Sequence, residues 1–400
     1  MLLASIEKKL DELRRRAELP LAIELWNGKR YTLAEPASVI LRIPRASALK
    51  YFIDTDLSKL GEAYVEGHVE VEGPIGDILR AAEGLSRSLG GDKKGRRPGL
   101  LNLHSKSRDA RAVQYHYDVS NEFYQLFLDR EMVYSCAYFK SGAEDIHTAQ
   151  AQKLDHICRK LRLQPGDKFL DIGCGWGALA RWAVNHYGVE ATGVTLSENQ
   201  HRLASERIKA AGLQERCRVL LQDYRDVEGE GVFDKIASVG MFEHVGLKNL
   251  PVYFGTITRL LKDGGVVMNH GITSVDPESR AVGLGGGDFI HKYVFPHGEL
   301  PHISLALKEM SSAGLEVMDV ETLRLHYART LWQWSARLEQ NLAQARQHTD
   351  EKRLRIWRTY LAGCAHAFES NWVSIQQILA VKNSNPASHP LPWTRQWIYE

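Results

Sequence analysis

An apolar run that ends in closely spaced glycines restricts the possible fold of this chain more than any other feature. Residues 169–177 read FLDIGCGWG, so a strand-like segment leads directly into three glycines at alternate positions. Because glycine has no Cβ atom, backbone N–H groups at such a turn can approach a ligand, and a helix that begins there favours an anionic group. A glycine-rich turn alone is a weak signal. The plain alternative is a tight strand-to-helix connection in which Asp171 is a satisfied cap.

Strand-like and helix-like segments alternate on both sides of this turn. Short apolar runs predict strands, and the amphipathic segments between them predict helices. The strands are expected at 168–173, 191–197, 217–224, 233–240 and 265–273, and the helices near 147–162, from about 177, at 198–212 and at 250–261. This order predicts an α/β fold, in which a parallel sheet is covered by helices on both faces. Ligands of such sheets bind at the carboxyl ends of the strands.

The residues before this region predict a separate small unit. Residues 1–88 are expected to form an α+β domain that begins with an amphipathic helix. Two alternating runs flank Asn27 and Gly28, which is a good hairpin signal. A further strand is expected at 37–44, a helix at 48–54 and another strand at 61–73.

A basic segment follows this unit. Residues 89–112 combine Gly, Pro and a dense run of positive charge, which is typical of a linker or a loop. The basic residues are Lys93, Lys94, Arg96, Arg97, Lys106, Arg108 and Arg111. The remaining region, residues 113–400, is expected to carry helices rich in Trp and Tyr at 329–342 and 353–372.

Composition narrows the classes of function. The formal net charge is +2, so overall charge does not indicate nucleic acid. The five cysteines are scattered and form no C-x-x-C pair, which supports neither a disulfide framework nor a zinc ribbon and fits a reducing cytoplasm. His291, His297 and His302 lack the spacing of metal ligands, so no metal site is expected. No apolar run reaches the roughly 18 residues that a membrane span needs, so a membrane would be contacted at its surface.

The glycine spacing also bears on the ligand. It is G-x-G-x-G and not the G-x-G-x-x-G of dinucleotide-binding proteins, and the next strand ends at Thr195 without an acidic residue for a ribose. Both features argue against a nicotinamide cofactor. The pattern resembles the S-adenosylmethionine loop of Rossmann-like methyltransferases, and QDYRD at 222–226 resembles the adenine-contacting segment of that fold.

A set of longer motifs resembles one family more closely, in order, over about residues 110–380. The motifs are YHYDVSNEFY at 115–124, YSCAYF at 134–139, TLSENQ at 195–200, GMFEHVG at 240–246, KYVFPHGELP at 292–301, HYARTLWQW at 326–334 and YLAGCAHAF at 360–368. Together they resemble the cyclopropane-fatty-acyl-phospholipid synthases and their relatives, the mycolic acid cyclopropane synthases. Residues 61–73 further resemble the small N-terminal domain of bacterial members, which looks like a sterol-carrier lipid-binding fold.

The resemblance implies a reaction and its cofactors. Such enzymes transfer the methyl group of S-adenosylmethionine to a cis double bond of a phospholipid acyl chain, and a proton is lost as a cyclopropane ring closes. The carbocation on the way requires a site that excludes water, aromatic faces that stabilise positive charge, and a base near the new methyl group. The resemblance implies that this base is a bound bicarbonate.

The resemblance of the motifs implies which residues of this chain would form a bicarbonate site. Its residues would be Cys136, Glu243, His270, Ile272 and Tyr327. Cys136 and Ile272 would contribute backbone N–H groups. Glu243 would accept from the bicarbonate hydroxyl, while His270 and Tyr327 would donate. Alone, the pair of Glu243 and its neighbouring histidine would more often be a strand-end cap or a surface pair.

Cofactor residues and a sixth catalytic candidate follow in the same way. The cofactor residues are expected to be Tyr134, Ser135, Phe169, Leu170, Asp171, Ile172, Gly173, Cys174, Gly175, Trp176, Gly177, Thr195, Gln200, Tyr224 and Arg225. Cys364, in the motif AGCAHA, has been regarded as a catalytic cysteine in this family. A packed thiol at a close helix contact is the alternative for that residue.

The resemblance also implies partners and a location. It implies a phospholipid with an unsaturated acyl chain, peripheral contact with the inner face of the membrane from the cytoplasm, no nucleic acid, and a homodimer. Two other functions stay open. The first is an S-adenosylmethionine-dependent methyltransferase that acts on another lipid or small molecule without ring closure. The second is a lipid-binding carrier with a vestigial methyltransferase domain.

Overall fold

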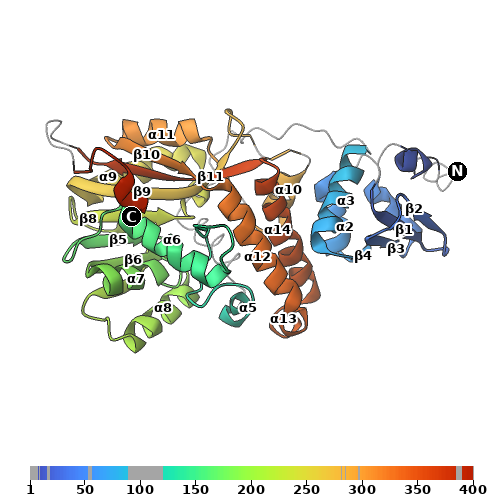
Figure 1. Ribbon diagram of the computed structural model, residues 1–400, viewed down its shortest axis with the longest axis horizontal. Coiled ribbons are helices and arrows are strands. Elements are labelled where there is room, and N and C mark those ends of the chain that lie inside the picture. The colour runs from blue at the N-terminus through green and yellow to red at the C-terminus, as the bar shows by residue number, and fades with distance from the viewer. Residues whose placement is uncertain are drawn as a thin grey trace.

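The computed structural model of the chain has two sheets at opposite ends of an elongated molecule, with helices between them (Figure 1). The structure describes residues 8, 10–15, 19–52, 56–88, 120–280, 282–283, 285–295, 298–383 and 390–399. The predicted basic linker, residues 89–112, lies outside the described residues, so the expected boundaries at its two ends stay predictions. Residues 8 and 10–15 are helical, as expected for that segment.

The N-terminal part is built on a four-stranded sheet with the order β2-β1-β3-β4. Its elements are β1 (Leu21–Leu25), β2 (Arg30–Thr32), β3 (Val39–Ile43), the 3-10 helix η1 (Ala46–Phe52), α2 (Leu57–Val65), β4 (Glu70–Glu72) and α3 (Ile75–Ser88). The predicted hairpin is confirmed, because β1 and β2 pair antiparallel across Asn27 and Gly28. Gly28 has a φ of 80°, a conformation that glycine adopts without strain.

The prediction of a single strand over residues 61–73 is wrong for its first half. Residues up to Val65 belong to α2, which begins after Asp56, whose side chain accepts from the backbone N–H of Lys59 at 3.0 Å. Ala63 is buried in the core of the small sheet, whereas Val65 is buried in a core formed with the rest of the chain. A helix enclosed on two sides buries both positions, so tertiary packing overrode the local alternation.

The second sheet has seven strands in the order β10-β11-β9-β8-β5-β6-β7. The strands are β5 (Lys168–Ile172), β6 (Glu190–Thr195), β7 (Cys217–Leu221), β8 (Phe233–Val239), β9 (Leu261–Ser274), β10 (Glu316–Thr322) and β11 (Val373–Val381). The predicted strands are confirmed as β5 to β9. These five strands are parallel, as expected. The sheet also has two strands that the sequence did not predict, and one of them, β11, runs antiparallel to both β9 and β10. All nine residues of β11 are buried, and the adjacent Gln376 and Gln377 interrupt the alternation that would have marked the segment as a strand.

Helices cover both faces of this sheet, as predicted. The α-helices are α5 (Asn121–Gln125), α6 (Ile146–Lys160), α7 (Ala178–Tyr187), α8 (Glu198–Ala210), α9 (Leu250–Leu260), α10 (Gly286–Tyr293), α11 (Ile303–Ser312), α12 (Arg324–Gln340), α13 (Leu342–His348), α14 (Glu351–Glu369) and α15 (Gln396–Tyr399). The 3-10 helices are η2 (Tyr224–Asp226), η3 (Phe242–His244) and η4 (Leu247–Asn249). Neighbouring strand residues point to opposite faces, so Phe169 is buried in a core with α6, α7 and α8, and Leu170 in a core with α9 and α11.

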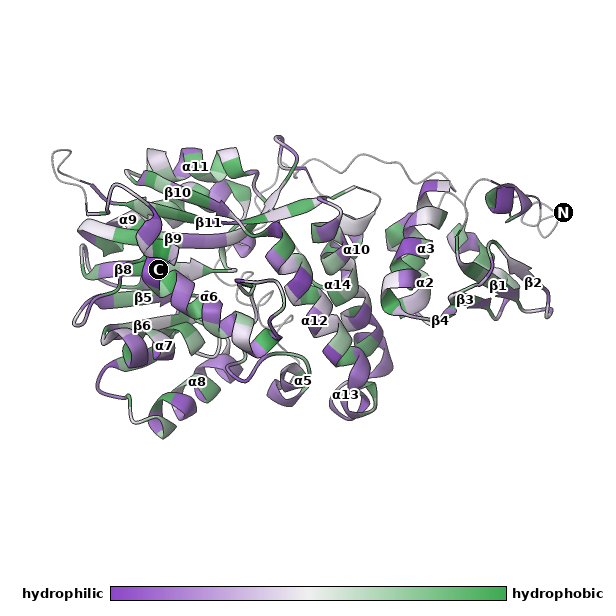
Figure 2. Ribbon diagram, viewed as in Figure 1, coloured by the Kyte–Doolittle hydropathy of each residue, from purple (hydrophilic) through white to green (hydrophobic). Residues whose placement is uncertain are grey.

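Helices α12 and α14 pack on each other and join the two parts of the chain (Figure 1). Hydrophobic and hydrophilic residues alternate around both helices (Figure 2), and α14 contacts α2 and α3. Arg355 donates to the carbonyl of Tyr64 and to the carboxylate of Glu70, each at 2.9 Å. His366 Nε2 lies 2.8 Å from the carboxylate of Glu83. None of the helices in the described ranges has the length and apolar character to cross a bilayer.

Candidate active site

A cavity of about 950 Å³ runs between the two parts of the chain, and we call it the interdomain cavity. Its N-terminal wall includes Leu41, Leu60 and Leu85, which belong to the small sheet and its helices. Its opposite wall includes Glu243 and His270 at the edge of the large sheet. The core of the N-terminal part therefore opens toward the polar residues that the sequence singled out.

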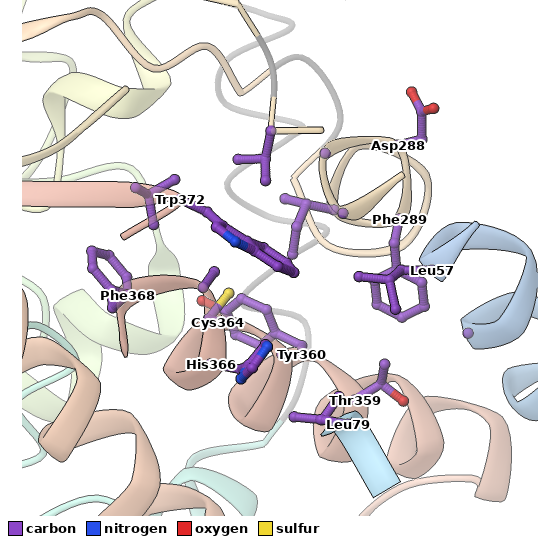
Figure 3. A pocket seen from close by; sticks show the side chains of 18 of the residues that line it. Leu57, Leu79, Asp288, Phe289, Thr359, Tyr360, Cys364, His366, Phe368 and Trp372 are labelled. Atoms are coloured by element: carbon purple, nitrogen blue, oxygen red, sulfur yellow. The ribbon is translucent and has the colours of Figure 1, made fainter. Parts of the chain in front are cut away.

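Apolar and aromatic side chains line the middle of the interdomain cavity. Figure 3 places Leu57 of α2, Phe289 of α10, and Tyr360 and Cys364 of α14 around one space, together with Trp372. These residues come from segments that lie far apart in the sequence. A cavity of this composition suits a hydrocarbon chain, because burial of its apolar surface is favourable and few polar groups are left unpaired.

All of the predicted catalytic residues line this cavity. They are Cys136, Glu243, His270, Ile272, Tyr327 and Cys364. Glu243 lies in η3, directly after β8, and His270 lies in β9, which pairs parallel with β8. Gly271 allows this close approach, because a Cβ atom at that position would lie 2.2 Å from the ring of Phe242. The residue type at position 271 thus places Glu243 against the end of β9.

Glu243 and His270 are both buried, and each has one atom without a partner. Glu243 Oε1 accepts from the backbone N–H of Ile272 at 2.7 Å, and His270 Nδ1 lies 3.2 Å from Gln377 Nε2. Glu243 Oε2 and His270 Nε2 have no hydrogen-bond partner among the described residues. Burial raises the pKa of Glu243 to about 7 and lowers the pKa of His270 well below its usual value. The wall of the interdomain cavity therefore carries a neutral imidazole and a carboxyl group whose pKa is raised by burial.

The cysteines at the cavity are poor nucleophiles in this environment. Cys136 is fully buried, and burial raises the pKa of its thiol. Burial raises the pKa of Cys364 to about 12, so its thiol is protonated at neutral pH. Tyr327 packs its ring against Phe368 with a centroid distance of 4.6 Å. The raised pKa of Cys364 favours the packed-thiol interpretation of that residue.

A second cavity of about 140 Å³ lies over the carboxyl ends of β5, β6 and β8, and we call it the cofactor cavity. Most of the predicted cofactor residues line it, namely Tyr134, Ser135, Asp171, Ile172, Gly173, Cys174, Gly175, Trp176, Thr195, Gln200 and Tyr224. Gly175 has a φ of 54°, and no atom lies within 4 Å of the place where a Cβ atom would be. The loop therefore presents bare backbone to the cavity at this glycine.

Four predicted cofactor residues do not line the cofactor cavity. Phe169 and Leu170 are buried in the cores on the two faces of the sheet. A Cβ atom at Gly177 would lie 3.2 Å from Ala204, so this glycine serves helix packing. The guanidinium of Arg225 donates to Asp223 from Nε at 2.8 Å and from Nη2 at 2.6 Å.

The two cavities meet, because four residues line both of them: Tyr134, Ser135, Gly240 and His244. Ligands in the two cavities would touch at this junction. The sequence did not predict the junction, since it requires the loop before α6 to lie against the end of β8. His244, whose role the sequence left open, packs its ring edge-on against Phe295 at a centroid distance of 5.1 Å.

Lys153 is a residue at the cofactor cavity that the motifs did not reveal. It lies on the buried face of α6, and the residue is 2% exposed. Its position shares the helical period of Ile146, Ala149, Leu154 and Ile157, so a lysine on an apolar face was the available signal. In the part of the chain that the structure describes, no group of three or more His, Cys, Asp or Glu residues is arranged to hold a metal.

Comparison with known proteins identifies the family. The family described as mycolic acid cyclopropane synthetase matches residues 104–378, which is more than half of the chain. This chain belongs to the mycolic acid cyclopropane synthetase family. A domain family of unknown function matches residues 10–94 of this cyclopropane synthetase family member.

Relatives of this cyclopropane synthetase family member align with it over most of its length. A "probable fatty acid methyltransferase" of Pseudomonas putida is 48% identical over 398 residues and covers 100% of both chains. The cyclopropane-fatty-acyl-phospholipid synthase of Escherichia coli K12 is 34% identical over 368 residues, which are 90% of this chain and 92% of the relative.

Solved structures of the same family share the fold. The cyclopropane synthase MmaA2 of Mycobacterium tuberculosis aligns with a TM-score of 0.66 and 32% identity, over 70% of this chain and 100% of that chain. The mycolic acid cyclopropane synthase CmaA1, in complex with S-adenosylhomocysteine and CTAB, gives a TM-score of 0.65 and 35% identity over 71% and 100% of the two chains. This cyclopropane synthetase family member is an S-adenosylmethionine-dependent methyltransferase, and its large sheet has the corresponding fold.

Proposed function

We propose that this enzyme transfers the methyl group of S-adenosylmethionine to a cis double bond of an unsaturated phospholipid acyl chain and closes a cyclopropane ring. The observation that carries the proposal is the junction at which the apolar interdomain cavity meets the cofactor cavity. A substrate that reacts there must have an apolar segment that lies in the interdomain cavity. An acyl chain has this property, whereas a small polar acceptor would leave most of the cavity unused.

The residues around the junction suit a reaction that passes through a cation. Bound S-adenosylmethionine supplies an electrophilic methyl group. The apolar walls exclude water, which would otherwise trap a carbocation as an alcohol. Tyr134, Tyr327 and Tyr360 line the cavity, and their rings can stabilise positive charge on the acyl chain. The hydroxyl groups of Tyr134 and Tyr360 lie 3.1 Å apart, so they engage each other.

The second part of the proposal is that bicarbonate is held beside Glu243 as the proton acceptor. Glu243 Oε2 and His270 Nε2 are buried without partners, and the hydroxyl of Tyr327 and the N–H of Cys136 have no hydrogen-bond partner among the described residues. A small oxyanion with one hydroxyl would satisfy such a set. The N–H of Ile272 already donates to Glu243, so its part would be to orient that carboxylate. The unpartnered polar groups of these residues therefore fit a bound bicarbonate.

The third part of the proposal concerns the lipid and where it is met. The N-terminal wall would hold the portion of the acyl chain beyond the double bond, so the small domain would serve as part of the substrate site. We further propose that the enzyme works at the membrane surface on the cytoplasmic side, with the basic segment 89–112 attracted to anionic head groups. A homodimer is a separate expectation, which cross-linking or light scattering would test.

Lipid mass spectrometry of cells that express the enzyme tests the proposed reaction. Phospholipid acyl chains should gain one CH2 unit, and chemical cleavage at the double bond should fail on the product. Upfield cyclopropane proton resonances in the extracted lipid would establish the ring. A gain of one CH2 with retention of a double bond would support the second candidate, a fatty acid methyltransferase without ring closure, which the name of the Pseudomonas putida relative favours. An unchanged lipid pool would contradict both.

A further inference from the structure

A buried lysine stands at the wall of the cofactor cavity with most of its hydrogen-bonding capacity unused. Lys153 Nζ donates to Ser135 Oγ at 2.8 Å, and this is its one hydrogen-bond partner among the described residues. An ammonium group can donate three hydrogen bonds. No carboxylate oxygen in the described part of the chain lies within 4.0 Å of Lys153 Nζ, so the lysine forms no ion pair there. A buried cation of this kind requires further acceptors, because burial without them is costly.

The charged groups around Lys153 indicate where its unused hydrogen-bond donors can find acceptors. Burial lowers the pKa of Lys153 to about 8, while Asp129, Cys136 and Asp171 oppose that shift electrostatically. The carboxylate of Asp129 is engaged by two backbone N–H groups, from Glu131 at 2.9 Å and Val133 at 2.8 Å. Asp171 lines the cofactor cavity, where its Oδ2 is buried without a partner. Lys153 lines the cofactor cavity and is not part of the interdomain cavity wall.

The sheet order shows which end of the cofactor would lie near Lys153. The strands follow the order β8, β5, β6, β7 along the edge, so Gly240 after β8 and Tyr224 after β7 lie toward opposite ends of the cavity. Ser135 and Gly240 belong to the junction with the interdomain cavity, where the methyl group must be delivered. A cofactor that delivers its methyl group at the junction would then extend its adenosine toward Tyr224, which leaves the side of Ser135 and Lys153 for its amino-acid part.

We propose that Lys153, held by Ser135, is the cation that binds the carboxylate of the amino-acid part of S-adenosylmethionine. Nothing else among the Lys and Arg residues of the described chain lines the cofactor cavity, so Lys153 is the available positive partner for that carboxylate. The lone oxygen of Asp171 lies in the same cavity and can accept from the ammonium group of the cofactor. The proposal depends on the cofactor alone and is independent of the identity of the lipid.

Calorimetry with two ligands and no lipid tests this assignment. S-adenosylmethionine and its decarboxylated analogue differ by the carboxylate, and neither turns over without an acceptor. Lys153→Met keeps the length of the side chain and removes the charge. We expect the variant to bind S-adenosylmethionine about 10- to 100-fold more weakly, as for a lost charge-assisted hydrogen bond, and to bind the analogue with an affinity changed by less than about threefold.

Lys160→Met is the matched control. Lys160 is the other fully buried lysine of α6, but it pairs with Glu321 at 2.6 Å and lines neither cavity. This control should lower the melting temperature and keep the preference of the wild-type protein for the carboxylate-bearing ligand. Equal weakening of both ligands by Lys153→Met, or unchanged affinity for S-adenosylmethionine, would overturn the assignment.

A crystal structure with S-adenosylhomocysteine decides the matter without any variant, should Lys153→Met not fold. The carboxylate of that ligand is expected within about 2.7–3.2 Å of Lys153 Nζ, the usual hydrogen-bond range. A carboxylate held by other residues would show the proposal to be wrong. Either outcome leaves the lipid reaction untouched, because it is tested by lipid analysis.

Discussion

The carboxylate of Glu243 accepts a hydrogen bond from the backbone N–H of Ile272 at 2.7 Å. Glu243 follows β8 and Ile272 lies near the end of β9, and these two strands are parallel neighbours. The bond fixes one carboxylate oxygen and leaves the other buried at the cavity without a partner. The end of this apolar strand lies at the wall of the interdomain cavity, so the acidic residue that follows it lines that cavity.

Replacing Glu243 with Gln should separate catalysis from cofactor binding. The variant keeps the shape of the side chain, and its amide oxygen can still accept from the N–H of Ile272. The charge is lost, and an NH2 donor replaces the second oxygen that would accept from the bicarbonate hydroxyl. Turnover on lipid vesicles should fall on the order of a hundredfold or more, as for a lost positioned polar group, while affinity for S-adenosylmethionine changes little. Glu215→Gln, at an exposed position, is the control. Near-normal turnover of Glu243→Gln would assign Glu243 a structural role.

The same variant should change how stability depends on pH. Burial raises the pKa of Glu243 to about 7 in the folded protein, so the folded state retains a proton that the unfolded state has lost. Raising the pH from about 4.5 to 7 therefore destabilises wild-type protein relative to Glu243→Gln, by at most on the order of 3 kcal/mol. Denaturant unfolding of the ligand-free proteins at a series of pH values measures the difference. A pH-independent difference would mean that Glu243 titrates normally.

Bicarbonate should stimulate the enzyme if it is the proton acceptor. We expect activity to fall in rigorously degassed, carbonate-free buffer and to return when bicarbonate is added. A tightly held anion can survive purification, so the depletion is repeated with His270→Ala, which removes one proposed donor. If neither protein responds and a crystal shows only water beside Glu243, then Glu243 itself is the base.

The glycine loop should determine cofactor affinity at Gly175. The φ of 54° and the open space around the missing Cβ atom mean that a side chain here would enter the cofactor cavity. Gly175→Val should greatly weaken binding of S-adenosylmethionine in calorimetry. Gly142→Val is a matched control, because Gly142 also has a positive φ of 81° and open surroundings but lines neither cavity. Equal affinities of the two variants would show that the cofactor has been misplaced.

Filling the N-terminal wall should impair the use of long acyl chains. Ala82 of α3 lines the interdomain cavity, and a ring at that position would occupy space proposed for the lipid. Ala82→Phe should raise the KM for long-chain lipid several-fold and leave affinity for S-adenosylmethionine unchanged. Arg80→Phe, on the exposed side of the same helix, is the control. An unaltered KM for Ala82→Phe would separate the N-terminal part from the substrate site.

Local patterns in the sequence were sufficient for much of the large sheet. Strands β5 to β9 could be predicted because each is a short apolar run between helix-like segments, and the glycines after Phe169 to Ile172 mark the turn that follows. Strand β11 could not be predicted, because all nine of its residues are buried and the adjacent polar residues Gln376 and Gln377 break any alternation in its sequence. Helix α2 was mistaken for a strand because its five residues from Gly61 to Val65 also alternate.

Most residues that line the candidate site could be predicted one by one, but Lys153 and the contacts among these residues could not. Parallel strands bring their carboxyl ends to one edge, so the position of Glu243 after an apolar run already places it near a ligand. Segments far away in the chain decide whether its carboxylate is buried, from which N–H it accepts a hydrogen bond and which cavity it lines. Tyr134 meets Tyr360 across 226 residues of sequence, and Lys153 lies behind Ser135 because α6 packs beneath that loop. Hydrogen bonds, burial and the shifted pKa values arise from such long-range contacts, and no local pattern encodes them.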